Sequence, residues 1–293
     1  MANLKDLKNR IKSVKSTQKI TSAMKMVAAA KLRRAQDNAE QSRPYAERMK
    51  VMIAELAGRM DAASGPTLLV GTGRTENHLL VVVSADRGLC GGFNGGIIRA
   101  TRREIERLQA EGKSPKLLMV GRKAADALRR EFGELFIDTL EGIQGTSVSF
   151  NDALSISTRI QDMIEDGTVD TCSIVFNRFV SAITQEVTFS SLVPADVDAA
   201  EEQETPGAIV PNEYEPDEAS VLNDLLPRAL TTAIYAAILE SSASELAARM
   251  TAMDNATRNA GDMIDRLSME YNRTRQAAIT TELIEIISGA EAL

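Results

Sequence analysis

The amino-terminal segment LKDLKNRIKSVKSTQKITSAMKMVAAAKLRRA (residues 4–35) carries the strongest structural signal in the chain. Ten positions in it follow one another at alternating steps of three and four residues. This spacing is typical of a coiled-coil seam on an α-helix. The seam is apolar at its start and polar in its middle. Its members are Leu4, Leu7, Ile11, Val14, Gln18, Thr21, Lys25, Ala28, Leu32 and Ala35. Residues 1–60 are therefore predicted to form one coiled-coil helix or two collinear ones, with Pro44 as the point of bending or division.

A row of lysines lies directly beside this seam, each one position after a seam residue: Lys5, Lys8, Lys12, Lys15 and Lys19. Residues 1–34 hold ten basic side chains and one acid, Asp6, although the whole chain has a net charge of −7. Such a row could bind nucleic acid, an anionic membrane or an acidic protein surface, or could be a solvated flank of the coiled coil. The segment has no Trp or Phe, so contact with protein or simple solvation is favoured over nucleic acid and membrane.

The carboxyl-terminal segment, residues 217–293, is predicted to be a second long helix. About 70 helical residues span about 100 Å, so such a helix needs a partner along its length. Small residues along it permit close approach of another backbone: Ala229, Ala233, Ala236, Ala243, Ala247 and Ala260. We therefore expect the two terminal helices to form an antiparallel pair.

The middle of the chain, residues 78–194, has a different pattern. Apolar runs predict strands at 78–84, 115–121, 171–180 and 183–194, the last two paired across a short turn. Helical periods are predicted at 97–109, 122–132 and 149–167. The alternation predicts a small Rossmann-like α/β domain with a partly parallel sheet. The expected fold class is thus mixed α/β, a long antiparallel coiled coil with this domain inserted.

Two connections separate these parts. Residues 61–77, with Gly65-Pro66 and the glycines at 71 and 73, are predicted to be a linker. Residues 195–216 are predicted to be an acidic loop, because the stretch 195–218 holds nine acidic side chains, three prolines and no basic residue.

The glycine-rich segment DRGLCGGFNGG (86–96) is the main enzymatic candidate, since it joins a predicted strand to a predicted helix, where backbone amides can bind phosphate. Its glycines fit neither G-x-G-x-x-G nor the P-loop pattern. A nucleotide-binding enzyme built on residues 78–193 is therefore the alternative function. The structural interpretation is a tight turn packed against another subunit or a terminal helix.

Other chemistry-bearing residues are few. The single histidine, His78, excludes a histidine-based metal cluster, and Cys90 and Cys172 are expected to be reduced thiols without metal spacing. Glu282 and Glu285 lie one helical turn apart and are expected on a solvated or interface face. No stretch approaches the roughly 20 apolar residues of a membrane span. No signal-peptide pattern is found, and a bacterial cytoplasmic protein is expected.

Four segments resemble the gamma-subunit family of bacterial F-type ATP synthases. They are the runs at 4–36 and 256–290, SADRGLCGGFN (84–94) and YEPD (214–217), in the same order along the whole chain. No insertion with a cysteine pair lies between residues 194 and 230, which argues against the redox-regulated chloroplast form.

The resemblance implies a central rotor shaft that couples proton flow through a membrane c-ring to cycling of catalytic beta subunits. The implied partners are three alpha and three beta subunits, an epsilon subunit and the c-ring, without nucleic acid. The implied location is the cytoplasmic side of the bacterial inner membrane, peripherally. No catalytic residue, cofactor or metal is implied on this chain, because alpha and beta subunits bind the Mg-ATP and Mg-ADP.

The resemblance also implies which residues touch partners. Met24 should approach the moving lever of a beta subunit. Polar contacts with the alpha–beta ring are implied for Arg249, Gln276, Thr280 and Glu282. Tyr214 and Glu215 should lie near the c-ring.

Overall fold

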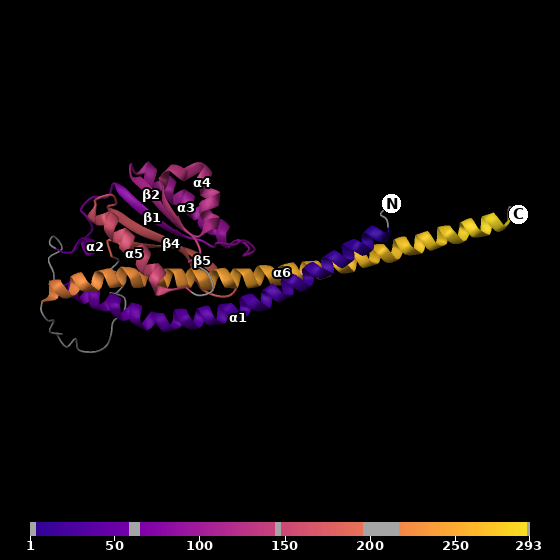
Figure 1. Ribbon diagram of the computed structural model, residues 1–293, viewed down its shortest axis with the longest axis horizontal. Helices are drawn as coiled ribbons and strands as arrows, with labels where there is room; N and C mark the ends of the chain where they lie inside the picture. Colours follow the sequence, from indigo (N-terminus) through magenta and orange to yellow (C-terminus); the bar gives the residue numbers. More distant parts are fainter. Residues whose placement is uncertain (1–3, 59–64, 144–147, 196–216, 292–293) are drawn as a thin grey trace. The chain divides into compact units, whose positions relative to one another are not determined.

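The computed structural model describes residues 4–58, 65–143, 148–195 and 217–291 of the 293-residue chain. They divide into two compact units. The domain unit comprises residues 31–248, and the helix-pair unit comprises residues 1–30 and 249–293. Two long helices, α1 (Leu4–Ala57) and α6 (Glu218–Glu291), contribute to both units (Figure 1).

The domain unit is built on a five-stranded sheet in the order β3-β2-β1-β4-β5. Its strands are β1 (Asn77–Val83), β2 (Ser114–Val120), β3 (Phe136–Leu140), β4 (Thr171–Phe179) and β5 (Gln185–Val193). The first four run parallel and β5 pairs antiparallel with β4. The connecting helices are α2 (Thr67–Val70), α3 (Phe93–Ala110), α4 (Arg122–Phe132), the 3-10 turn η1 (Gly133–Leu135) and α5 (Phe150–Glu165). The expected fold class is confirmed.

Helices cover both faces of this sheet. Leu80 and Val82 of β1 pack with α3 and α4, whereas Leu79, Val81 and Val83 pack with α5 and α6. Successive residues of a strand point to opposite faces, so a strand buried on both sides needs a continuous apolar run. This is why the sequence HLLVVVS, without polar alternation, folds as the central strand.

The structure departs from the predicted elements at several places, one of them the short helix α2 within the predicted linker 61–77. Strand β3 (FIDTL, 136–140) was not predicted; it is an edge strand of five residues, all only half-buried, two of them polar. Helix α3 begins at Phe93, so Gly95 and Gly96 are helical rather than part of the loop. Helix α1 continues through Pro44 without division.

The helix-pair unit is an antiparallel coiled coil, as predicted. The first part of α1 lies side by side with the part of α6 that precedes its free yellow end (Figure 1). Lys25 Nζ contacts Asp254 Oδ1 at 2.6 Å, and the hydroxyls of Thr21 and Thr257 are 2.7 Å apart. On the paired part of α6, one row of residues that are not exposed recurs at steps of four and three: Met253, Thr257, Ala260, Ile264, Leu267, Tyr271 and Thr274.

The two long helices also pack together within the domain unit. Met49, Ile53 and Leu56 of α1 are buried in one cluster with Leu222 and Leu226 of α6. The predicted small residues of α6, from Ala229 to Ala260, are all buried or half-buried. Among the described residues, no helix combines the length and apolar character needed to cross a membrane.

Candidate functional site

The predicted partner contacts that the structure describes all belong to the helix-pair unit. Lys25 faces Asp254, and Thr21 faces Thr257. In this antiparallel register, the residue number of a position on α1 and that of the position opposite it on α6 sum to about 279. Gln18 agrees, because its Nε2 would lie 3.2 Å from a Cβ placed on Gly261. By this register the described start of α1, at Leu4, lies level with about residue 275 of α6.

The predicted contacts therefore fall into two groups. Met24 and Arg249 lie where the helices pair, and both are half-buried. Gln276, Thr280 and Glu282 lie beyond the described start of α1, and all three are exposed. About 40 Å of helix separate Arg249 from Gln276, so the structure does not bring the two groups together. Tyr214 and Glu215 lie outside the described residues.

Residues 276–291 of α6 form a segment without α1 beside it among the described residues, visible at the yellow end of Figure 1. We call this segment the tip; it is about 24 Å long. Thr280 Oγ1 donates to Gln276 O at 2.9 Å, as expected for two residues on one helical face. Large apolar side chains of the tip are strongly exposed: Ile279 (49%), Leu283 (54%), Ile284 (58%), Ile286 (67%) and Ile287 (57%). Apolar clusters of this kind mark interaction surfaces.

The polar middle of the seam contains a charged cluster. Asp254 accepts from Lys25 at 2.6 Å through one carboxylate oxygen and from Arg258 at 2.5 Å through the other. The hydrogen bond from Lys25, followed by that from Arg258, lowers the pKa of the Asp254 carboxyl. The lysines predicted beside the seam, from Lys5 to Lys19, are all exposed. The pair thus presents a cationic row toward solvent next to a polar seam.

Two polar side chains of the glycine-rich segment, Asp86 and Asn94, bond to backbone groups of the domain. Asp86 accepts from the backbone amides of Arg122 at 3.2 Å and Gly142 at 3.0 Å. Asn94 Oδ1 accepts from the amide of Ala85 at 3.1 Å. These groups tie the end of β1 to α4 and to the segment after β3, so they serve the domain's own structure.

The same loop lies at the carboxyl edge of the sheet, where the strand order reverses between β1 and β4. Ligands of doubly wound folds bind in the crevice at this point. Here Ala248 of α6 packs against Ala85, Cys90 and Phe93. The loop thus packs against the chain's own helix α6, which favours the structural interpretation of the loop over nucleotide binding.

The single histidine and the two cysteines are built into the domain. His78 Nδ1 and Nε2 are each 2.7 Å from a hydroxyl, of Thr171 and Ser173 respectively, and burial lowers the His78 pKa. Cys90 and Cys172 are buried, and burial raises the pKa of the Cys172 thiol. Within the described ranges, no group of three or more His, Cys, Asp or Glu residues could hold a metal.

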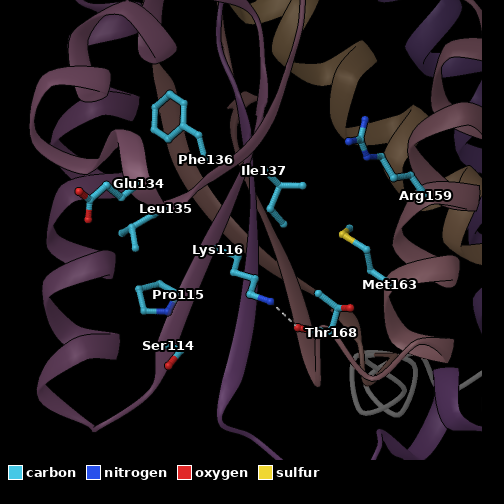
Figure 2. Close-up of a pocket in the computed structure, with 10 residues that line it drawn as sticks. All are labelled: Ser114, Pro115, Lys116, Glu134, Leu135, Phe136, Ile137, Arg159, Met163 and Thr168. Atoms are coloured by element: carbon cyan, nitrogen blue, oxygen red, sulfur yellow. Dashed lines mark hydrogen bonds between the residues drawn. The ribbon is translucent and has the colours of Figure 1, made fainter.

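A hollow of about 490 Å³ lies at the opposite edge of the sheet, where β2 and β3 begin beside α5 (Figure 2). Phe136, Ile137 and Met163 give it an apolar lining. The two basic side chains of its lining have partners within the domain. Lys116 Nζ donates to Thr168 O at 2.8 Å, and Arg159 forms an ion pair with Asp138. The hollow therefore presents apolar surface rather than a group poised for chemistry.

Comparison with known proteins decides the family. A family model described as ATP synthase matches residues 3–293. The curated ATP synthase gamma chains of Rhodospirillum rubrum and Paracoccus denitrificans (strain Pd 1222) are 54% and 53% identical to this chain, over 100% of both chains in each case. The chain belongs to the ATP synthase gamma-chain family.

The chain is also similar in fold to chains of solved ATP synthase structures. A chain of the Tetrahymena thermophila mitochondrial ATP synthase central stalk and c-ring structure matches with a TM-score of 0.61 at 29% identity, covering 81% of this chain and 99% of that one. A chain of the Euglena gracilis mitochondrial ATP synthase in rotational state 3 has a TM-score of 0.67 at 20% identity, covering 99% and 94%. The second likeness concerns the fold alone.

One feature of this gamma chain was not predicted from the sequence. The apolar tip residues were not selected, although the signal existed: apolar residues continue beyond residue 275, where the described pairing with α1 ends. The packing of the glycine-rich loop against a terminal helix was one of the two predicted alternatives, but Ala248 itself was not identified, because the two segments are far apart in sequence.

Proposed function

We propose that this gamma chain is the central rotor shaft of a bacterial F-type ATP synthase. It couples proton flow through the membrane c-ring to conformational cycling of the catalytic beta subunits, in ATP synthesis or in reverse proton pumping. One structural observation carries the proposal beyond family membership. The tip exposes large apolar side chains around a helix that no other described segment covers, so it requires an apolar bearing supplied by partners.

The proposed partners are three alpha and three beta subunits around the helix pair, together with the epsilon subunit and the c-ring. The tip would turn inside the alpha–beta ring, with Gln276, Thr280 and Glu282 adding polar contacts. Lower on the pair, Met24 would approach the moving lever of a beta subunit, and Arg249 would make polar contacts with the alpha–beta ring. Tyr214 and Glu215 are proposed to contact the c-ring.

The coupling mechanism follows from the unequal faces of the helix pair. One side carries the exposed lysine row of α1, whereas the paired part of α6 exposes charges of both signs, among them Asp262, Arg266 and Glu270. As the shaft turns, each beta subunit meets a different face in sequence and is switched as a rigid body. Exposed charge contacts are individually weak, so they can form and break in every turn.

The chain itself is proposed to be non-catalytic and to hold no cofactor, metal or nucleic acid. Mg-ATP and Mg-ADP would bind to alpha and beta. The hydrogen bonds of Asp86 within the domain and the packing of Ala248 against the glycine-rich loop support this role. The bacterial relatives support a location on the cytoplasmic side of the inner membrane, peripheral and through the complex.

A rotation assay tests the proposal. Alpha and beta subunits are fixed to a surface with this chain, and a probe is attached to an introduced cysteine, Gln109→Cys, at the exposed end of α3. Cys90 and Cys172 are buried, so labelling is directed to the new thiol. We expect ATP-dependent rotation in one direction. A stationary probe on an ATP-hydrolysing assembly, or tight ATP binding by the isolated chain, would contradict the proposal.

A further inference from the structure

The sheet of the domain unit has an incomplete edge at the carboxyl end of β4. The last residue pair between β1 and β4 is Val82 with Val175, but β4 continues to Phe179 and is paired there only with β5. Buried backbone groups on the side that β1 has left need other partners, because an unpaired amide or carbonyl is costly. The partners in this molecule come from α6.

Two side chains of α6 complete this edge. The amide of Phe179 donates to Glu240 Oε2 at 3.0 Å, so residue 179 presents its amide away from β5. Asn177, two residues earlier, presents its backbone to the same side of the strand. Its carbonyl accepts from Ser244 Oγ at 2.9 Å, in a buried position. Side chains of a helix thus replace the hydrogen bonds of a missing strand.

The third contact of this helical face lies one turn further on. Ala248 packs against Cys90 and Phe93 of the loop that follows β1. Residues 240, 244 and 248 follow one another at steps of four, so they lie in one row on α6. We call Glu240, Ser244 and Ala248 the domain anchor. It joins α6 to both sides of the point where the strand order reverses.

We infer that the domain anchor is the device that prevents the α/β domain from turning relative to α6 when torque passes between them. The inference rests on the proposed rotor function. Apolar packing has little directional preference, and a smooth contact resists rotation about the helix axis poorly. Hydrogen bonds to fixed backbone groups are directional, and those to a carboxylate are stronger than neutral ones. Glu240 and Ser244 are therefore positioning residues for torque transfer.

The test compares ATP hydrolysis with proton pumping in the complete ATP synthase in membrane vesicles. The double variant Glu240→Gln with Ser244→Ala weakens both directional contacts and keeps the side-chain volumes close to the originals. We expect the rate of ATP hydrolysis to stay near that of the wild type. The rate of pumping against an established proton gradient should fall roughly threefold or more, the factor that corresponds to the net free energy of one hydrogen bond. The matched control, Glu106→Gln with Ser155→Ala on exposed positions of α3 and α5, should leave both rates unchanged.

A cross-link supplies the converse experiment. Ala248→Cys places a thiol in the cluster that contains Cys90, and disulfide formation is verified by mass spectrometry. In the double variant, the disulfide between Cys90 and the cysteine at position 248 should restore proton pumping. In a chain that carries only Ala248→Cys, the same disulfide should leave pumping unchanged. If the bridge alone abolishes pumping, the anchor has to open during rotation and the inference is overturned, even if the double variant fails to assemble.

The outcomes separate this inference from the proposed function. If the double variant has the wild-type ratio of proton pumping to ATP hydrolysis, the inference about the domain anchor is overturned, while the rotor proposal stands. Failure of the native chain to support ATP-driven pumping in an assembled complex would instead contradict the rotor proposal itself.

Discussion

At the scale of single residues, one glycine fixes the geometry of the domain's carboxyl edge. Gly121, directly after β2, has a φ of +100°, and a Cβ built on it would lie 1.8 Å from the carbonyl oxygen of Ser84. Ser84 itself donates its amide to Val120 O at 2.7 Å and accepts from the amide of Ala124 at 3.1 Å. The ends of β1 and β2 and the start of α4 therefore meet without room for a side chain.

Replacement of this glycine gives a sharp prediction for stability. Gly121→Ala should lower the free energy of unfolding by more than about 3 kcal/mol, because it combines a backbone clash with a disfavoured φ. Gly112→Ala is the matched control: its φ is also positive, at +76°, but no atom lies within 4 Å of the added Cβ. Its cost should be about 1 kcal/mol. Chemical denaturation of both variants measures the difference, and equal costs would contradict the steric argument.

At the scale of elements, the helix pair depends on a polar cluster within its seam. Polar residues at a coiled-coil seam specify register at some cost in stability. The sequence predicted this polar stretch at Gln18, Thr21 and Lys25. It could not identify Asp254 or Thr257 as the partners, because antiparallel pairing brings together residues whose separation along the chain leaves no periodic signal.

The Asp254 carboxyl makes the pair sensitive to acid. Its folded pKa lies below the ordinary value because of Lys25 and then Arg258. A depressed carboxyl pKa stabilises the fold above the unfolded pKa of about 3.9, and this stabilisation disappears as pH falls through the folded value. Asp254→Asn should therefore speed amide exchange in the helix-pair unit at pH 7, and the difference from wild type should shrink below about pH 3.9 and vanish once the pH is below the folded pKa. A difference that persists in acid would exclude the charge mechanism.

The tip gives a prediction about coupling rather than folding. Gln276→Trp with Thr280→Trp adds bulk at exposed positions, so the free energy of unfolding should change by about 0.5 kcal/mol or less. ATP-driven proton pumping by the reassembled complex should nevertheless fall strongly, because the proposed bearing fits closely around the tip. Gln109→Trp, exposed on α3, serves as control and should pump normally. Unchanged pumping in the tip variant would count against this placement.

The α/β domain shows which elements a sequence can specify. Strands β1, β2, β4 and β5 were predicted within about two residues from their apolar runs. Strand β3 was not predicted, because its five half-buried residues include Asp138 and Thr139, which give the segment the composition of a loop. The domain anchor was not predicted for another reason: Glu240 and Ser244 bind backbone groups, and every residue has these groups whatever its side chain.

At the scale of the whole molecule, apolar burial is unevenly distributed. The sheet of the domain unit is enclosed on both faces, whereas the helix-pair unit relies on a single seam with polar members. Local stability follows the density of buried contacts. Each unit should therefore respond differently to the loss of partner subunits.

Hydrogen exchange measures this difference directly. In the isolated chain, amides of residues 4–20 and 262–291 should exchange at least about tenfold faster than those of β1 and β4. The helical segments are packed along a single seam, or along none in the tip, whereas the strands are enclosed on both faces. Assembly with alpha and beta should slow exchange in both helical segments and leave the strands unchanged. Equal protection across the isolated chain, with a sharp cooperative melt at high temperature, would contradict the expectation of a shaft that is marginally stable alone.

The uncovered tip has a consequence for cellular supply. The end of a long helix that no other described segment covers frays more readily than its packed part, so copies of the chain that have not joined the proposed ring would offer this stretch to proteases in an unwound form. Copies enclosed by the ring would not. Surplus chains would thus be removed selectively, and the ratio of shafts to rings would be kept in balance without a dedicated regulator.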